Sequence, residues 1–93
     1  MLKMICVEKF LDMLVLPARI DFIYKGKNIT GDILLIEHLY IEETALICKI
    51  QNAKHTLSIT TASIEHIFYD DAAGIFSLKI RNDDYWIVIK TFK

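Results

Sequence analysis

Three histidines and two cysteines are the side chains of this sequence best suited to metal binding or nucleophilic catalysis. No pair among them stands at the short spacing typical of zinc sites, so we expect no metal centre. They are His38, His55, His66, Cys6 and Cys48. His66 shares the alternation of Ile64 and Phe68, and a histidine in that setting is most often a structural residue at the boundary of the core.

Acidic pairs are the next candidates for chemistry. Asp70-Asp71 and Asp83-Asp84 stand in turn-like segments, without the ladder of oxygen ligands that a calcium loop needs. Exposed turn carboxylates are also poor acid–base catalysts, because that role needs burial. The three glycines do not cluster, which excludes a phosphate-binding loop, a dinucleotide fingerprint and a nucleophile elbow. We therefore expect no enzyme and no cofactor.

Length and composition indicate one soluble domain spanning residues 1–93. Hydrophobic residues make up 54% of the chain, which excludes intrinsic disorder. Lys and Arg number 11 against 12 acidic residues, a formal net charge of -1. That balance argues against a uniformly basic nucleic-acid binder, although it leaves room for a local basic patch.

The cysteines and the N-terminal residues predict a cytoplasmic protein. Cys6 and Cys48 are far apart and each lies in an apolar run, as is typical of reduced thiols. Glu8, Lys9 and Asp12 interrupt the apolar stretch that a signal peptide requires. No run of apolar residues approaches the length of a membrane span.

The first sixteen residues favour a helix, predicted over residues 3–15. Met4, Val7, Leu11 and Leu14 stand at helical spacing, and Pro17 ends the pattern. A strand over Lys3–Val7 is the alternative, because the segment has no good N-cap residue.

After Pro17 the hydrophobic period changes from 3.6 to 2, which predicts strands. We expect a five-strand core over residues 17–69 and a C-terminal hairpin over residues 75–93. Many short strands with turn residues between them are typical of an antiparallel, strongly bent meander that forms a small barrel. The expected strands are Arg19–Lys25, Ile29–Ile41 with a bend at Gly31, Ala45–Gln51, His55–Thr60, Ile64–Tyr69, Ile75–Arg81 and Tyr85–Phe92.

Two stretches carry a family resemblance. Gly26–Glu37, with glycines at 26 and 31 and spaced hydrophobics up to an acid, resembles the first motif of the Sm-like family. Ile59–Ile67 is similar to the second motif, with hydrophobics at its first, sixth and ninth places. The resemblance implies an N-terminal helix and five bent strands in a small SH3-like barrel. Where the family has its RNA-contacting residues, this sequence has Tyr40-Ile41 and Thr60-Thr61, so uridine binding is not implied. The hairpin of residues 75–92 is additional to the family plan and could cover an edge strand.

An excess of apolar strand positions predicts self-association. Ile33–Ile36 and Tyr85–Ile89 are apolar on both faces of a strand, whereas a sheet with one wet face should alternate. One short helix can cover one such patch but hardly both. We expect a non-enzymatic interaction module that forms homo-oligomers and acts as an adaptor or inhibitor of a macromolecular partner. The predicted interface consists of Leu34, Ile36, Trp86, Ile87 and Ile89.

A nucleic-acid-binding role is the alternative. In a simple up-and-down meander the basic turns share one end of the molecule, opposite the acidic turns at residues 42–43 and 83–84. Neighbouring tyrosines could stack on unpaired bases there, and binding would be sensitive to salt. The residues for this reading are Lys25, Lys27, Lys54 and His55.

Overall fold

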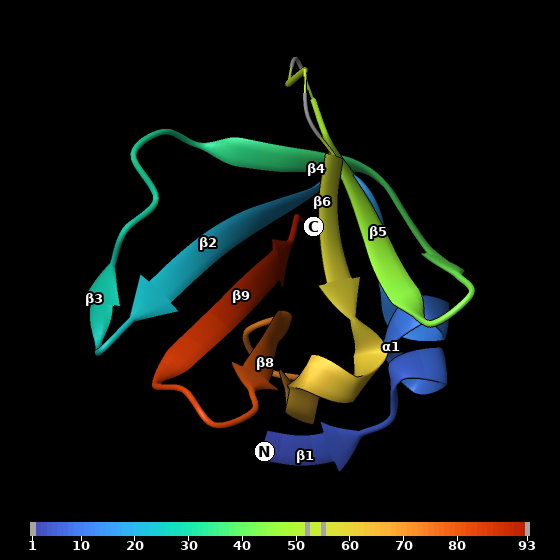
Figure 1. Ribbon diagram of the computed structural model, residues 1–93, viewed down its shortest axis with the longest axis vertical. Helices are drawn as coiled ribbons and strands as arrows, with labels where there is room; N and C mark the ends of the chain where they lie inside the picture. The colour runs from blue at the N-terminus through green and yellow to red at the C-terminus, as the bar shows by residue number, and fades with distance from the viewer. Residues whose placement is uncertain (1, 52, 55, 93) are drawn as a thin grey trace.

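The computed structural model describes residues 2–51, 53–54 and 56–92. Within these residues the chain forms one nine-stranded antiparallel sheet, one α-helix and one turn of 3-10 helix (Figure 1). The elements are β1 (Leu2–Ile5), α1 (Val7–Met13), β2 (Ala18–Tyr24), β3 (Lys27–Asn28), β4 (Leu34–Glu42), β5 (Ala45–Ile50), β6 (Thr56–Thr60), η1 (Thr61–Ser63), β7 (Ile64–Asp70), β8 (Ile75–Ile80) and β9 (Tyr85–Thr91). The prediction of a mainly β, antiparallel protein is confirmed.

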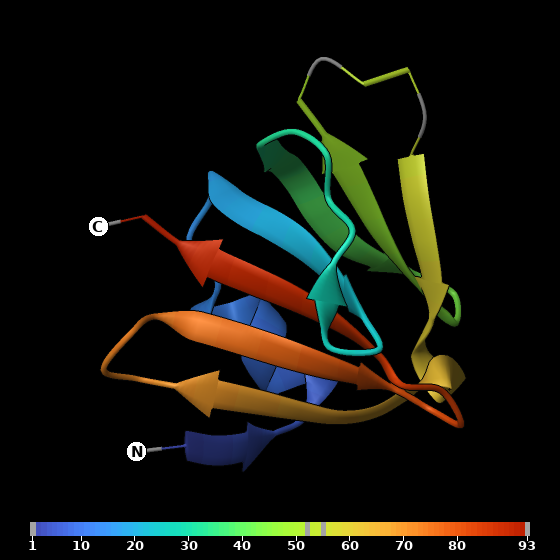
Figure 2. The same cartoon turned by 90° about the vertical axis from the view of Figure 1, so that its left-hand side faces the viewer.

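The strand order is β1-β7-β8-β9-β2-β4-β5-β6, with β3 paired to β2 beside this path. The sheet bends strongly on itself, so that β5 and β6 come to face β8 and β9 (Figures 1 and 2). Its two edge strands, β1 and β6, do not pair with one another in the described part of the chain, and the sheet stays open.

The C-terminal hairpin lies in the middle of the sheet, which corrects its expected place as an addition at the edge. β9 pairs with β2 from Ala18–Thr91 to Tyr24–Tyr85, and β8 joins β9 to β7. A strand that is apolar on both faces needs cover on both faces. On β9, Ile87 and Ile89 are buried in the core, whereas Trp86 and Val88 on the opposite face are half-buried.

The N-terminal segment begins as a strand, so the expected helix over residues 3–15 is wrong in residues 3–6 and ends two residues early. Leu2–Ile5 pairs with β7, with Ile5 opposite Ile67. The helix is confined to Val7–Met13 and points Phe10 into the core, where the side chain is fully buried. The alternative of a strand near Lys3–Val7 is the better description of the first residues, because pairing with β7 overrides their helical spacing.

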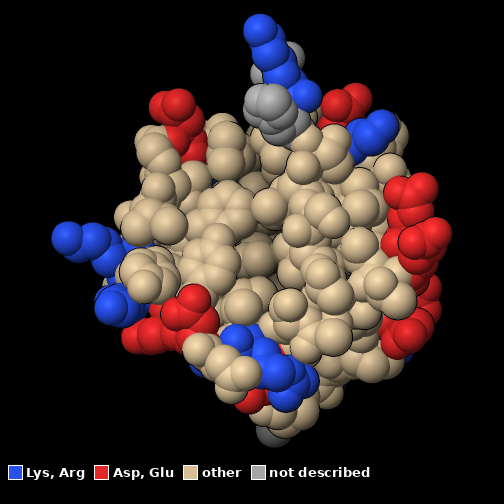
Figure 3. All heavy atoms as spheres, in the orientation of Figure 1, with Lys and Arg blue, Asp and Glu red and all other residues tan. Residues whose placement is uncertain are grey.

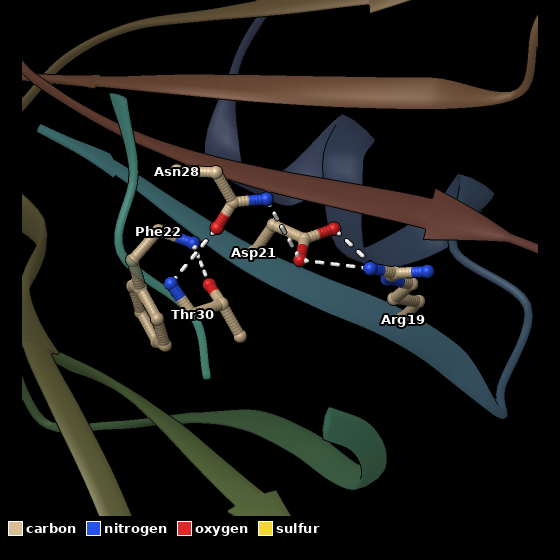
Figure 4. Close-up of polar contacts among 5 residues, drawn as sticks. All are labelled: Arg19, Asp21, Phe22, Asn28 and Thr30. Atoms are coloured by element: carbon tan, nitrogen blue, oxygen red, sulfur yellow. Dashed lines mark hydrogen bonds and ion pairs between the residues drawn. The ribbon is translucent and has the colours of Figure 1, made fainter. Parts of the chain in front are cut away.

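The segment that follows β2 is fastened back onto it by side-chain hydrogen bonds (Figure 4). The Thr30 hydroxyl oxygen accepts a hydrogen bond from the Phe22 backbone N–H at 2.7 Å, and the Asn28 side-chain oxygen accepts one from the Thr30 N–H at 2.8 Å. Asp21 accepts a longer bond from the Asn28 amide and pairs with Arg19 at 3.0 Å. These contacts interrupt the long strand expected over Ile29–Ile41, so that β4 begins only at Leu34.

Two register shifts mark extra residues in the long strands. On β4 the pairing steps from Ile36 to His38, which leaves Glu37 without an opposite residue on β5. On β7 the pairing steps from Ile64 to His66, which leaves Glu65 without an opposite residue on β8. Such bulges bend a strand and redirect the side chains beside them.

Candidate functional site

Three of the five predicted interface residues are core residues. Ile36, Ile87 and Ile89 are 0%, 2% and 1% exposed, so within this chain almost none of their surface is accessible to a partner. The reason is the bend of the sheet, which folds its inner face into a core that α1 helps to fill. Leu34 and Trp86 are half-buried and remain accessible.

Trp86 lies on the outer face of the sheet. Its ring is 6.1 Å from the ring of Phe68, and the Lys79 ammonium lies 6.0 Å from its centre. These neighbours shield part of the indole. Trp86 therefore lies on a different surface from Ile87 and Ile89, the two β9 residues predicted to share an interface with it.

The predicted basic site is divided. Lys25 lies in the turn after β2 and Lys27 is the first residue of β3, whereas Lys54 lies in the β5–β6 loop. Both views separate these two regions (Figures 1 and 2). The Lys25 N–H donates to the Asp84 carbonyl oxygen at 2.8 Å, so a basic and an acidic turn lie side by side. The expected opposition of these turns is wrong, because β9 pairs with β2. His55 lies outside the described residues.

The two described histidines are both exposed, so the prediction that His66 lies at the boundary of the core is wrong. His38 lies 3.9 Å from the Glu37 carboxylate, and the ring of His66 lies 5.7 Å from the ring of Phe68. Among the residues that the structure describes, no three His, Cys, Asp or Glu side chains gather closely enough to hold a metal ion.

The free edge of β6 is the surface that stands out for binding. Among the described residues β6 pairs with β5 alone, which leaves the backbone groups of its other side without a strand partner. Thr56–Thr60 contains no charged residue and no proline, the features that usually protect an edge strand. Leu57 and Ile59 point inward and are half-buried, as their alternation predicts, while Ser58 is exposed.

A hollow adjoins this edge. We call it the seam groove; its volume is about 290 Å³, and no charged side chain of the described chain lines it. The lining residues are Leu57, Ser58, Ile59, Thr60, Ser63, Ile80, Tyr85 and Ile87. Figure 3 shows the corresponding face as a broad uncharged surface, hollowed near its centre, with Lys, Arg, Asp and Glu at its margin.

Tyr85 forms one wall of the seam groove. Its ring stacks on Phe22 at 6.4 Å with an interplanar angle of 11°, and Tyr24 meets it edge-on at 6.2 Å. Burial and the nearby Asp83 carboxylate raise the pKa of the Tyr85 hydroxyl, so it is a neutral hydrogen-bonding group at physiological pH. The groove thus offers apolar and aromatic contacts with hydroxyl groups, and no site for a charged ligand.

The sequence of β6 is symmetric in residue type about Ser58. It reads Thr-Leu-Ser-Ile-Thr from residue 56 to residue 60. An antiparallel partner with the same sequence, centred on Ser58, would place Leu57 opposite Ile59 and Thr56 opposite Thr60. The two Leu57–Ile59 pairs would then lie on one face of the joined sheet, and the Thr and Ser side chains would lie on the other face.

Comparisons with protein-family models, with curated proteins and with solved structures find no match. In the described part of the chain, no helix has the length and apolar character needed to cross a membrane.

Sequence reasoning missed the β6 edge as a site. The strand was predicted over His55–Thr60, but nothing local shows that a strand will lie at the edge of a sheet. The available signal was the absence of charge across Thr56–Thr60, together with the symmetry of that segment.

Proposed function

We propose that this protein is a non-enzymatic interaction module that self-associates through β6. Two copies join their β6 strands antiparallel about a two-fold axis at Ser58, which continues the sheet from one copy into the other. The observation that carries the proposal is an uncharged edge strand, self-complementary in sequence, beside an uncharged groove.

Physical considerations support a second copy of the chain as the occupant. A two-fold interface requires that the same surface be complementary to itself, and Thr56–Thr60 meets that requirement residue by residue. The strand also lies at the outer margin of the bent sheet, on the far side of β5 from β4 (Figure 2). Leu57 and Ile59 from both copies would form one apolar row above the joined seam grooves.

The biological role that we propose is that of a cytoplasmic adaptor or inhibitor, whose paired form presents two copies of its remaining surfaces to a macromolecular partner. Both thiols are free, which is consistent with a reducing compartment.

Disulfide trapping tests both the association and its register. In a Cys6→Ser background, Ser58→Cys should form a disulfide-linked dimer on mild oxidation, because opposed residues have Cα atoms about 4.5–5.5 Å apart, within disulfide range. Thr56→Cys alone should remain monomeric, since equivalent residues would be separated by about 14 Å along the strands. An equimolar mixture of Thr56→Cys and Thr60→Cys should cross-link. Equal yields of disulfide-linked dimer from Ser58→Cys, from Thr56→Cys alone and from the mixture would contradict the register.

A charge at the symmetry axis provides the second test. Ser58→Lys places two ammonium groups face to face and should convert a dimer at tens of micromolar protein into a monomer, measured by light scattering after size-exclusion chromatography. Ala72→Lys adds the same charge to the exposed β7–β8 turn and should leave the dimer intact. A wild-type protein that stays monomeric at this concentration would overturn the proposal.

The nucleic-acid alternative makes a different prediction. It requires salt-sensitive binding of a single-stranded oligonucleotide that Lys27→Glu weakens. Because the described basic residues lie in separate regions, we expect no such binding at low salt, and its detection would favour that alternative.

A further inference from the structure

A second groove lies on a different part of the molecule. It runs between the junction of β1 with α1, the first residues of β7 and the turn that joins β4 to β5, and its volume is about 440 Å³. It shares no lining residue with the seam groove or with β6. We call it the acidic groove, for the residues of its rim.

The walls of the acidic groove are held in place by backbone contacts. Thr61 donates from its N–H and from its hydroxyl to the Thr44 carbonyl oxygen, at 2.8 and 3.1 Å. These bonds fix the β4–β5 turn against the start of η1. On the other side β1 ends at Ile5, so β7 residues before Ile67 have no partner from β1. The bulge at Glu65 lies in this uncovered stretch.

The floor of the groove is apolar. Its hydrophobic residues come from four elements, and Met4 is 62% and Ile41 37% exposed, so part of this surface is in contact with water. They are Met4, Ile5, Val7, Ile41, Ile64 and Ile67. A volume of this size lies in the range of about 300–1,000 Å³ that is usual for ligand sites.

The rim carries negative charge. Glu8, Glu43 and Glu65 come from three separate segments and line the same groove, and no Lys or Arg of the described chain lines it. His66 and Cys6 complete its ionisable groups. Acidic side chains gather on the side of the molecule that carries α1 and the β4–β5 turn (Figure 3).

We propose that the acidic groove binds a segment of a partner protein in which an apolar side chain is flanked by Lys or Arg. The apolar side chain fills the floor, and the cations pair with the carboxylates of the rim. Charge complementarity selects this occupant, because an acidic or phosphorylated segment would be repelled by all three glutamates. This surface is separate from the proposed self-association through β6.

The groove contains its own reporter of occupancy. Cys6 is exposed and lines the groove, whereas Cys48 is buried and its pKa is raised to about 12, so it does not react near neutral pH. The rate of alkylation of Cys6 by iodoacetamide therefore measures access to the groove. The probe is the acetylated peptide Lys-Leu-Lys-Leu-Lys, compared with Lys-Ser-Lys-Ser-Lys and Glu-Leu-Glu-Leu-Glu.

We expect the first peptide to slow alkylation of Cys6 at least threefold in a saturable manner, and the other two to have little effect. Equal protection by the serine peptide would show that the lysines bind without help from an apolar side chain, and it would overturn the proposal. So would equal protection by the glutamate peptide, or the absence of protection by any of the three.

Variants locate the binding site. Glu43→Lys combined with Glu65→Lys should abolish protection, measured as the ratio of rates with and without peptide in the same variant. Glu42→Lys is the matched control, since Glu42 adjoins Glu43 but does not line the groove, and it should retain most of the protection. Ser58→Lys should retain full protection of Cys6, because Ser58 lies in β6 and not in the acidic groove. Peptide binding can therefore be tested whether or not the protein self-associates through β6. Protection that persists in the double variant would contradict the assignment of the site.

Discussion

The ring of Phe10 meets the ring of Phe76 edge-on, with centroids 5.0 Å apart and an interplanar angle of 70°. Phe10 is the one buried residue of α1, a helix that the structure describes throughout, and Phe76 lies on the inner face of β8. This contact, together with the packing of Val7, Leu11 and Met13 against the core, anchors the short helix on the bent sheet. It links the N-terminal wall of the acidic groove to the core.

Shortening Phe10 should destabilise the whole domain. Phe10→Ala removes a fully buried ring and should lower the free energy of unfolding by about 3–5 kcal/mol. Urea denaturation, followed through the fluorescence of the single tryptophan, measures the change. Phe10→Leu should lower the free energy of unfolding by less than Phe10→Ala. Leu11→Ala, at a half-buried position, should also lower it by less. Equal losses in the Phe10→Ala and Leu11→Ala variants would contradict the anchoring role of Phe10.

Replacing Cys6 by serine should stabilise the protein. Cys6 is the N-cap of α1 with extended backbone angles, yet in the described structure its side chain makes no capping hydrogen bond. A serine hydroxyl can accept one from the first turn, a gain of about 0.5–1 kcal/mol. Cys6→Ala offers no acceptor and should show no gain. Thermal or urea unfolding of the two variants in parallel gives the comparison.

The two thiols should react very differently. Burial raises the pKa of the Cys48 thiol from 9.0 to about 12, so a thiol reagent at neutral pH should titrate one cysteine in the native protein and two in denaturant. Two thiols reacting rapidly in the native state would contradict this.

The same shift predicts a loss of stability in alkali. The folded-state pKa of Cys48 is raised above its unfolded value, so the stabilisation is complete below about pH 9 and is lost as the pH rises toward 12. The free energy of unfolding should therefore fall more steeply with pH between 9 and 12 in the wild type than in Cys48→Ala. Parallel slopes in urea titrations across this range would argue against the shift.

The Thr30 hydroxyl should contribute to the position of the β2–β3 segment. Thr30→Val keeps the shape of the side chain but removes the acceptor of the 2.7 Å bond from the Phe22 N–H, at a cost of about 1–3 kcal/mol for a part-buried donor without a partner. Thr30→Ser retains the oxygen and should lose much less. The free energy of unfolding distinguishes the two, together with faster amide exchange at Phe22 in the valine variant.

Local pattern was sufficient for the strand content of this protein. Alternation predicted the strands that the structure has at Thr56–Thr60 and Ile75–Ile80, because side chains on a strand point to opposite faces in turn. Turn residues correctly separated β4 from β5 and β8 from β9. Two segments were exceptions. Met4 has helical spacing but lies in β1, because that strand pairs with β7, and the strand expected from Ile29 begins only at Leu34.

Strand order could be decided only by the tertiary structure. Hydrogen bonds in a sheet join segments far apart in the chain, and nothing local states that β9 pairs with β2 or that β6 stays at the edge. That order buries Ile36, Ile87 and Ile89, separates Lys25 from Lys54 and brings Glu8, Glu43 and Glu65 around one groove. Residue type thus determined which segments could be strands, whereas the bend and pairing of the sheet decided which residues are exposed.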